Sequence, residues 1–369
     1  MLMKYTDKEN CFYELFDSDT GLYIRSGELD DGRDTGVDPL MRDFPGLIDV
    51  GVMGHCAHGI SGYCKKSGTQ CYQNGSSVIR ENMSLENFCK IVDQCKGKVF
   101  QFALGGRGDV DQHENCEDLL AYSRKNGIVP NFTTSGYGLN HRIVGMLKEY
   151  VGAVAVSWYR SEYTQRAINM MISAGLKTNV HYILGKNSIE EAISRLGNDS
   201  FPEGINAVIF LLHKPKGLGT IDNALVLPNP SIQRFFELVD RKRFQFKVGF
   251  DSCSCAGIVN YTDNIDLECI DYCEGARFSC YIDAQMNMMP CSFAVGVEEW
   301  QICLQCSSIK EAWNSNAFSR FRSFLADSCS ECNHRKYCGG GCPLLPDITL
   351  CDRKERTTMP QAFEQPICV

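Results

Sequence analysis

Five cysteines crowd one stretch near the end of the chain, spaced C-x2-C-x5-C-x3-C-x8-C from Cys329 to Cys351. A C-x2-C pair places two sulfurs on one turn, where both can reach the same metal or cluster. Gly339, Gly340 and Gly341 allow the backbone to fold closely around such a group, because glycine has no Cβ. The stretch therefore predicts a metal or iron–sulfur site.

A second group of thiols lies in one loop: Cys56, Cys64 and Cys71, spaced C-x7-C-x6-C. Three cysteines can bind three irons of a [4Fe–4S] cluster and leave the fourth iron open to a small chelating molecule. His55 and His58 are alternative ligands in the same loop, although a solvated loop histidine needs no metal to explain it.

Composition limits what these thiols can be. The chain has 369 residues, 44% of them hydrophobic, and its net charge of −8 includes no basic run. Nucleic-acid binding and a membrane anchor are therefore not expected. The 21 cysteines are too many for packing, and no apolar export signal opens the chain. Thiolate–metal bonds in a reducing cytoplasm are favoured over disulfides.

Short apolar strands alternate with amphipathic helices from residue 48 onward, which predicts a parallel sheet, open or closed as a barrel. The predicted strands are Ile48–Met53, Val99–Leu104, Val129–Thr133, Ala153–Ser157, Thr178–Leu184 and Ala207–Leu212. The predicted helices are Ser84–Lys96, Glu114–Lys125, Asn140–Glu149, Glu162–Ala174 and Ser188–Leu196, and Ser84 and Ser188 are expected as N-caps. Chemistry is expected at the carboxyl ends of the strands, where the cysteine loop, residues 105–109, residues 133–136 and Ser157 lie.

These features, in this order, resemble the radical SAM superfamily. Gly105-Gly106-Arg107-Gly108-Asp109 resembles its glycine loop, and Thr133-Thr134-Ser135-Gly136 resembles its Thr-Thr-Asn-Gly step. Residues 268–351 resemble the SPASM extension, whose pattern is C-x9-15-G-x4-C, then C-x2-C-x5-C-x3-C and a last cysteine. The chain departs from the usual C-x3-C-x2-C motif, and Met286 stands where the extension has glycine. The resemblance covers residues 48–351.

The resemblance implies a partial (β/α)6 TIM-type barrel with a small C-terminal iron–sulfur SPASM domain. The expected divisions are a cap at 1–47, the barrel at 48–240, and a bridging region with the SPASM domain at 241–369. Cys56, Cys64 and Cys71 would bind the [4Fe–4S] cluster that cleaves S-adenosylmethionine. The residues expected to contact S-adenosylmethionine are Tyr72, Gly105, Gly106, Gly108, Asp109, Thr134, Ser135, Ser157 and His181. For His181, a role as a packed strand histidine is the alternative.

The same resemblance implies two auxiliary [4Fe–4S] clusters, which makes three in all. One would use Cys273, Cys280, Cys291 and Cys342; the other would use Cys329, Cys332, Cys338 and Cys351. Other cysteines are left without a definite role. Cys89, Cys95 and Cys116 are expected as buried small hydrophobes. The roles of Cys253, Cys255, Cys269, Cys303, Cys306 and Cys368 stay open.

The implied activity is that of a peptide maturase, whose 5′-deoxyadenosyl radical takes hydrogen from a ribosomally made peptide. A thioether crosslink from a cysteine is the favoured product; carbon–carbon crosslinking and epimerisation are alternatives. A sulfatase-type formylglycine maturase ranks lower, because Ser292 stands where that group has an acid. The expected partners are a cysteine-containing precursor peptide, a flavodoxin or ferredoxin as electron donor, and a separate leader-recognition protein. A structural zinc module is the non-enzyme alternative.

Overall fold

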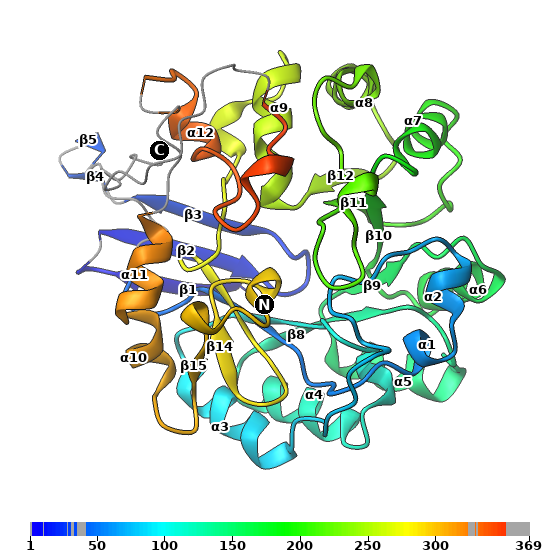
Figure 1. Cartoon of the computed structure of the whole chain (residues 1–369). Coiled ribbons are helices and arrows are strands. Elements are labelled where there is room, and N and C mark those ends of the chain that lie inside the picture. Colours follow the sequence, from blue (N-terminus) through cyan, green and yellow to red (C-terminus); the bar gives the residue numbers. More distant parts are fainter. Residues whose placement is uncertain are drawn as a thin grey trace.

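The computed structural model describes residues 2–9, 11–27, 29–30, 33–34, 42–323, 329 and 331–351. Cys368 lies outside the described residues, so its role stays a prediction. Figure 1 shows the chain coloured from its N-terminal strands to its C-terminal helices. No helix in the described part of the chain is long and apolar enough to cross a membrane.

The first strands form a small antiparallel sheet of β1 (Leu2–Asp7), β2 (Phe12–Asp17) and β3 (Tyr23–Gly27). A hairpin turn connects β2 and β3, where the Thr20 hydroxyl donates to the Asp17 carboxylate at 2.7 Å. A two-stranded ribbon of β4 (Leu29–Asp30) and β5 (Arg33–Asp34) follows. Arg25 of β3 connects the three-stranded sheet to the C-terminal half of the chain. Its guanidinium carbon lies 3.7 Å from the centre of the Phe278 ring, and its guanidinium group pairs with Asp271.

The central sheet contains seven consecutive parallel strands. They are β6 (Leu47–Val50), β7 (Gln101–Leu104), β8 (Val129–Thr134), β9 (Val154–Ser157), β10 (Thr178–Leu184), β11 (Ala207–Leu212) and β12 (Lys247–Phe250). Each pairs with the next in chain order. The six predicted strands are confirmed. The sequence did not reveal β12, because its Lys247-Val-Gly-Phe250 is not an apolar run.

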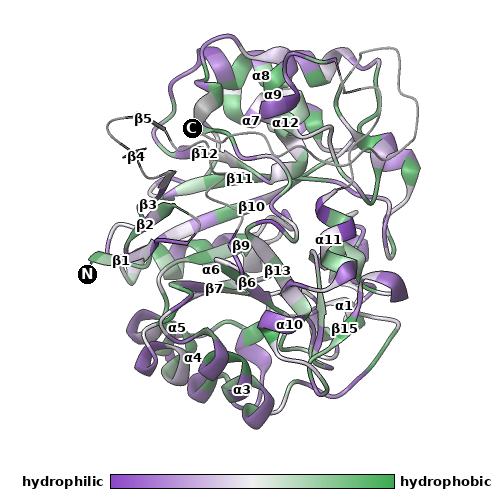
Figure 2. Ribbon diagram, turned by 90° about the vertical axis from the view of Figure 1, so that its left-hand side faces the viewer, coloured by the Kyte–Doolittle hydropathy of each residue, from purple (hydrophilic) through white to green (hydrophobic). Residues whose placement is uncertain are grey.

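Helices connect these strands, as predicted. They are α3 (Leu85–Cys95), α4 (Cys116–Lys125), α5 (His141–Tyr150), α6 (Glu162–Ser173), α7 (Ile189–Gly197) and α8 (Pro230–Arg241). Figure 2 shows hydrophilic and hydrophobic residues on each of α3, α4 and α5. Ser84 caps α3 by accepting from the Asn87 amide, as the sequence predicts. Ser188 also precedes its helix, but its hydroxyl bonds to Gly185 and Ile183 instead of capping.

The C-terminal part of the chain extends the sheet at its other edge. β13 (Ser279–Ile282) pairs in parallel with β6, and the antiparallel strands β14 (Asn287–Met289) and β15 (Ile302–Cys303) follow it. The sheet order is therefore β12-β11-β10-β9-β8-β7-β6-β13-β14-β15. Residues on either side of the expected boundary at 240/241 thus share one sheet, although the three-part division itself stays a prediction.

Short helices complete the described chain. They are α1 (Ala57–Ile60), α2 (Tyr63–Lys66), α9 (Cys255–Tyr261), α10 (Ile309–Trp313), α11 (Asn316–Arg322) and α12 (Arg335–Cys338). The 3-10 turns are η1 (Val110–Gln112), η2 (Ile221–Asn223), η3 (Ser252–Ser254), η4 (Leu267–Cys269), η5 (Ser292–Ala294), η6 (Glu298–Trp300) and η8 (Pro346–Ile348). The Trp313 indole donates to the Arg42 carbonyl at 2.7 Å, which fixes α10 to the start of the barrel.

The two faces of the sheet differ in chemistry. One face carries apolar side chains such as Ile48, Phe102 and Val180, which are buried in the main core. The other face is polar near the strand starts, where the Asn131 amide donates to Gln101 at 2.8 Å and the Asn206 amide donates to Asn179 at 2.7 Å. These amides line a cavity of about 310 Å³, which the β2–β3 hairpin also borders. The polar face therefore has room for ligands, and the apolar face does not.

Candidate functional site

The loop after β6 brings three predicted ligands together. Cys56 caps α1, and its sulfur accepts from the Gly59 amide at 3.2 Å. Gly62 has φ +78° and turns the chain from α1 into α2, which carries Cys64. Burial raises the pKa of Cys64 to about 12, and the charges of Cys56 and Cys71 raise it further. Two short helices thus close the wide C-x7-C-x6-C spacing, so that the three thiols interact.

Aromatic side chains surround Cys64. Its sulfur lies 2.7 Å from His58 Nδ1, and His58 Nε2 lies 2.6 Å from the Tyr163 hydroxyl. Burial lowers the pKa of His58 to about 4, so the ring is neutral and can donate to only one of these partners. The ring of half-buried Tyr159 is centred 4.4 Å from the His58 ring. These side chains shield the thiols from water.

The predicted glycine loop and the hydroxyl step lie side by side. The Asp109 carboxylate accepts from the Ser135 amide at 2.6 Å and from the Ser135 hydroxyl at 2.5 Å. The next carboxylate, Asp111, accepts from the Thr134 hydroxyl at 2.9 Å. Asp109 is also close to the thiols, because its charge is among the causes that raise the pKa of Cys56 to about 11, after burial. The cofactor loops and the thiol loop therefore share one rim of the sheet.

Two glycines of that loop are required by close contacts. A Cβ on Gly106 would stand 2.7 Å from the Tyr281 hydroxyl, and Gly106 has φ +101°. A Cβ on Gly108 would stand 2.4 Å from the His55 carbonyl. Gly105 is less restricted, because a Cβ there would stand 3.3 Å from the Thr133 side chain. The loop thus packs against β13 and the thiol loop.

The remaining predicted cofactor residues lie at different depths. Ser157 ends β9 and pairs with His181 of β10, which lines the 310 Å³ cavity together with the side-chain amides near the strand starts. Burial lowers the pKa of His181 to about 4. Tyr72 instead faces the C-terminal half, since its ring is centred 4.6 Å from the Phe293 ring. The structure places Tyr72 between the two thiol regions, and it places His181 away from the thiols.

A second set of thiols borders a cavity of about 540 Å³ between β12 and the C-terminal segment. Cys253, Cys273, Cys291 and Cys342 all line it. Cys342 is the largest cause of the raised pKa of Cys253 through a hydrogen bond, with burial next. Burial raises the pKa of Cys291 to about 12, and Cys253 raises it further. The structure therefore brings three of the four residues predicted for one auxiliary site together with Cys253.

Cys280 does not join that group. It lies on β13 between Ser279, which lines the cavity, and Tyr281, and successive side chains of a strand point to opposite faces. Its thiol is 1% exposed, and after burial the charge of Cys95 on α3 is the largest cause of its raised pKa. Cys280 therefore lies on the face of β13 opposite the cavity, and its role as a cluster ligand stays a prediction.

The four cysteines predicted for the other auxiliary site lie close together. Burial raises the pKa of Cys338 to about 11, and the charges of Cys329, Cys332 and Cys351 raise it further. Cys255 lies between the two sets, because its sulfur donates to the Tyr337 carbonyl at 3.0 Å and Cys253 is near. Helices α9 and α12, which carry these residues, are neighbours in Figure 1.

Most of the remaining cysteines lie outside the thiol sets. Cys95 and Cys116 are buried, as the sequence predicts, and Cys89 is half-buried. Cys269, Cys303 and Cys306 are exposed, and Cys269 also lines the 540 Å³ cavity.

The donor chemistry fits clusters better than a single ion. Among the described residues, no three His, Cys, Asp or Glu side chains are close enough to hold one metal ion. In a [4Fe–4S] cluster each cysteine binds a different iron, so the ligands need not converge on one point. Thiolates are the soft ligands that suit iron–sulfur clusters.

Sequence reasoning missed Asp49, which lines the same cavity as Cys273 and Cys291. It lies on β6 between Ala103 of β7 and Tyr281 of β13, and the Tyr281 hydroxyl continues toward Gly51 and Gly106. Asp49 is therefore between the glycine loop and the auxiliary thiols. The sequence signal that could have identified Asp49 is a single acidic residue inside an apolar strand, Leu47-Ile-Asp-Val50.

The Asp49 carboxylate is poorly stabilised as an anion. Burial raises its pKa to about 7, and the neighbouring charge of Glu274 raises it further. Tyr72, Tyr281 and Cys280 also interact electrostatically with Asp49, and Ala103 brings no ionisable group from β7. Within the described part of the chain, no hydrogen bond or ion pair reaches this carboxylate. Carboxyl groups of this kind are frequent at functional sites.

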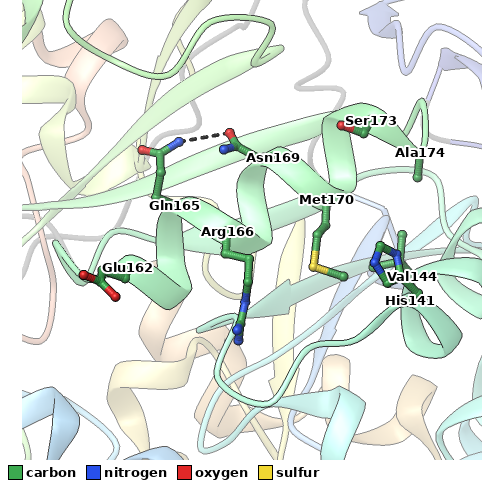
Figure 3. A pocket seen from close by; sticks show the side chains of 9 residues that line it. All are labelled: His141, Val144, Glu162, Gln165, Arg166, Asn169, Met170, Ser173 and Ala174. Atoms are coloured by element: carbon green, nitrogen blue, oxygen red, sulfur yellow. Dashed lines mark hydrogen bonds between the residues drawn. The ribbon is translucent and has the colours of Figure 1, made fainter.

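Another hollow, of about 690 Å³, lies on the outer surface between α5 and α6 (Figure 3). None of the predicted site residues lines it.

Known proteins resemble the chain in structure and not in sequence. No protein-family model and no curated protein matches it. Streptococcus suis SuiB bound to the precursor peptide SuiA matches with a TM-score of 0.67 at 15% identity, over 96% of this chain and 99% of that chain. SuiB bound to S-adenosylmethionine matches with a TM-score of 0.62 at 16% identity, over 81% and 73%. Native anSMEcpe with bound AdoMet and Cp18Cys peptide matches with a TM-score of 0.58 at 15% identity, over 85% and 93%. The chain therefore has the partial-barrel α/β fold of these two proteins, which confirms that part of the predicted fold class, and the iron–sulfur SPASM domain stays a prediction.

Proposed function

We propose that this chain is a radical SAM enzyme that modifies a ribosomally made peptide. One observation carries the proposal: the Cys56, Cys64 and Cys71 thiols share a rim with the Asp109–Ser135 pair, and a second thiol set lines a separate cavity together with Asp49. The comparisons support it, because SuiB binds S-adenosylmethionine and the precursor SuiA, and anSMEcpe binds AdoMet and a peptide.

The thiols divide into three proposed cluster sites. Cys56, Cys64 and Cys71 would hold the first [4Fe–4S] cluster; Cys253, Cys273, Cys291 and Cys342 the second; and Cys329, Cys332, Cys338 and Cys351 the third. Bound there, the clusters would supply the electron that cleaves S-adenosylmethionine and accept the electron released when the product bond forms.

The chain's own residues bind and orient the substrates. Asp109 and Ser135, with the backbone of Gly105, Gly106 and Gly108, contact the amino acid end of S-adenosylmethionine, and Thr134 and Ser157 complete that rim. His58, Tyr159 and Tyr163 exclude water from the first site. Tyr72 packs against Phe293 beside Cys291 and so fixes the first site relative to the second.

Asp49 is the proposed proton acceptor in the peptide cavity. For a thioether, the peptide loses one hydrogen atom from carbon to the 5′-deoxyadenosyl radical and one proton from the cysteine thiol. The carboxylate lies on the cavity wall between the two sites and can take that proton. Carbon–carbon crosslinking and epimerisation are alternative outcomes. Formylglycine formation remains the lower-ranked alternative, because Ser292 follows Cys291 where formylglycine maturases have an acid.

The proposed partners are a cysteine-containing precursor peptide, a low-potential flavodoxin or ferredoxin, and a separate leader-recognition protein. Purified enzyme mixed with a cysteine-containing peptide should lower the peptide mass by about two hydrogens. Resistance of the product to thiol alkylation would indicate a thioether. Deuterium gain without another mass change would indicate epimerisation instead.

Iron and sulfide content, together with 5′-deoxyadenosine formation, tests the core of the proposal. Reconstituted wild type should hold about twelve irons, and the triple variant Cys56→Ala/Cys64→Ala/Cys71→Ala about eight, without 5′-deoxyadenosine. The triple variant Cys89→Ala/Cys303→Ala/Cys306→Ala is the matched control and should keep both properties. A colourless, zinc-containing wild type would establish the structural zinc module instead.

A further inference from the structure

The outer surface of the Cys56–Cys71 loop carries exposed apolar and basic side chains. Ile60 is 53% exposed and Tyr63 is 39% exposed, and Lys65 and Lys66 are exposed on the same short helix as Tyr63. We refer to Ile60, Tyr63, Lys65 and Lys66 as the Tyr63 face. Large apolar side chains beside uncompensated positive charge are typical of surfaces that bind another protein.

The two lysines of this face are not engaged within the described structure. Neither Lys65 nor Lys66 forms an ion pair with any described acidic residue, although Lys66 Nζ lies 5.2 Å from the centre of the Tyr63 ring. The chain as a whole has a net charge of −8. A local positive patch on an acidic protein directs an acidic partner to that patch and repels it elsewhere.

Tyr63 also connects the surface to the proposed cluster ligands. Its ring is centred 6.2 Å from the His58 ring and 5.7 Å from the Tyr163 ring. His58 in turn lies 2.7 Å from the Cys64 sulfur. One layer of aromatic side chains therefore separates the Tyr63 face from Cys64.

Helix α6 continues this surface. Tyr163, in its first turn, contacts Tyr63, and Figure 1 shows α2 beside α6. The 690 Å³ hollow begins at Glu162 and extends along α6, and Figure 3 shows Arg166 and Met170 projecting into it. Arg166 adds a third basic group without an ion pair in the described structure, and Glu162 is the acid at the edge.

We propose that the Tyr63 face is the docking surface for an acidic, low-potential one-electron carrier protein that reduces the Cys56–Cys64–Cys71 site. This inference rests on the proposed function, because only a redox site needs such a donor. Electron transfer weakens steeply with distance, so the donor must dock where the protein layer over the site is thin. Such encounters use small surfaces and depend on charge for their rate, which fits a face of four residues.

The test compares two reductants on the same protein. The double variant Lys65→Glu/Lys66→Glu is reconstituted with iron and sulfide, and 5′-deoxyadenosine is measured with dithionite and with flavodoxin reduced by its NADPH-dependent reductase. We expect unchanged formation with dithionite and a decrease of about 10- to 100-fold with flavodoxin. Binding of oxidised flavodoxin, measured by calorimetry at low ionic strength, should weaken in parallel and should be salt-sensitive in the wild type.

The double variant Lys96→Glu/Lys125→Glu is the matched control. It makes the same change in net charge on exposed lysines at the ends of α3 and α4, away from the carboxyl ends of the strands. It should behave as wild type with both reductants. Tyr63→Ala, with the lysines intact, should also weaken flavodoxin binding.

The outcomes separate this proposal from the proposed function. If wild type forms no 5′-deoxyadenosine with dithionite, the proposed function is wrong. If dithionite works and both lysine variants retain flavodoxin binding and turnover, the docking surface is wrong. Loss of peptide binding with intact flavodoxin turnover in Lys65→Glu/Lys66→Glu would likewise overturn it and assign the face to the peptide.

Discussion

The loop that carries Cys56, Cys64 and Cys71 and the region that carries the auxiliary thiols are both rich in cysteine, but they are assembled differently. The first three thiols come from one loop after one strand, and two short helices bring them together. The Cys253 set comes from four segments between β12 and Cys342, and it depends on β13 joining β6 across the sheet. Local folding therefore defines the first region, and tertiary packing defines the second.

The positions of the predicted ligands show this difference between the two regions. No thiol of the first loop lies apart from the others, despite an unusual spacing. In the second region Cys280 points to the apolar face, and Cys253 occupies the cavity instead. A strand alternates its faces at every residue, so one position decides between ligand and core.

The largest expected effect tests whether the two regions act at different steps of the reaction. Cys64→Ala should lower 5′-deoxyadenosine formation at least about a thousandfold, equivalent to about 4 kcal/mol of activation free energy. The reason is that the variant lacks one ligand of the proposed cluster that passes the electron to S-adenosylmethionine. Cys342→Ala should retain this activity within about tenfold but lose the peptide product. Single-turnover assays with dithionite measure both. Equal loss in the two variants would mean that the regions do not have separate roles.

The second effect concerns which thiol completes the Cys253 set. Cys253→Ala should remove about four of about twelve irons, whereas Cys280→Ala should keep them all. Cys280→Ala should instead lower the free energy of unfolding by about 1 kcal/mol, because it removes a small buried side chain. Iron analysis and thermal unfolding check the pair, and the reverse pattern would restore Cys280 as the ligand.

The third effect concerns Asp49, where the two regions meet. Asp49→Asn should retain 5′-deoxyadenosine but lower the peptide product about 100-fold or more, and Asp49→Glu should recover part of it. Wild-type product formation should rise with pH through about 7, as the carboxylate becomes able to accept a proton. A flat wild-type profile, or product formation by Asp49→Asn at the wild-type rate, would exclude the role.

The same substitution has a consequence for stability. Burial raises the pKa of Asp49 from its model-peptide value of 3.8 to about 7, so the folded protein binds the proton more tightly than the unfolded chain. The protonated carboxyl therefore stabilises the fold fully below about pH 4, and this contribution is lost as pH rises to about 7. Asp49→Asn should unfold at a higher temperature than wild type at pH 8, and the two should converge at low pH.

The smallest effect concerns the turn before Cys291. Met286 has φ +63° at the position where the resembling pattern has glycine, and Met286 and Met288 are both fully buried. Each glycine substitution removes the same side chain, but only Met286→Gly relieves left-handed backbone strain. Met288→Gly should therefore be more destabilising by about 1–2 kcal/mol, measured by urea unfolding. Equal losses would show that the turn at Met286 is unstrained.

The alternation of strands and helices was readable in the sequence because each element carries its own pattern. Six strands and five helices follow from apolar runs and 3.6-residue periodicity, and Ser84 was identified as a cap from its type and place. β12 and β13 were missed, because one is polar at its start and the other is defined by its partner, β6. Ser188 failed as a cap since Gly185 and Ile183 compete for its hydroxyl.

The sequence by itself determined the parallel sheet, the end of the sheet at which the Cys56–Cys71 loop and the glycine loop lie, and the local groupings Cys56–Cys71 and Cys329–Cys351. Spacing and periodicity are local properties, so they carry these conclusions. Only the tertiary structure decided that Cys253 faces the cavity, that Cys280 does not, and that Asp49 lies between the two thiol regions. These placements depend on β13 pairing with β6 in one particular register, and such a contact between distant segments leaves no local pattern.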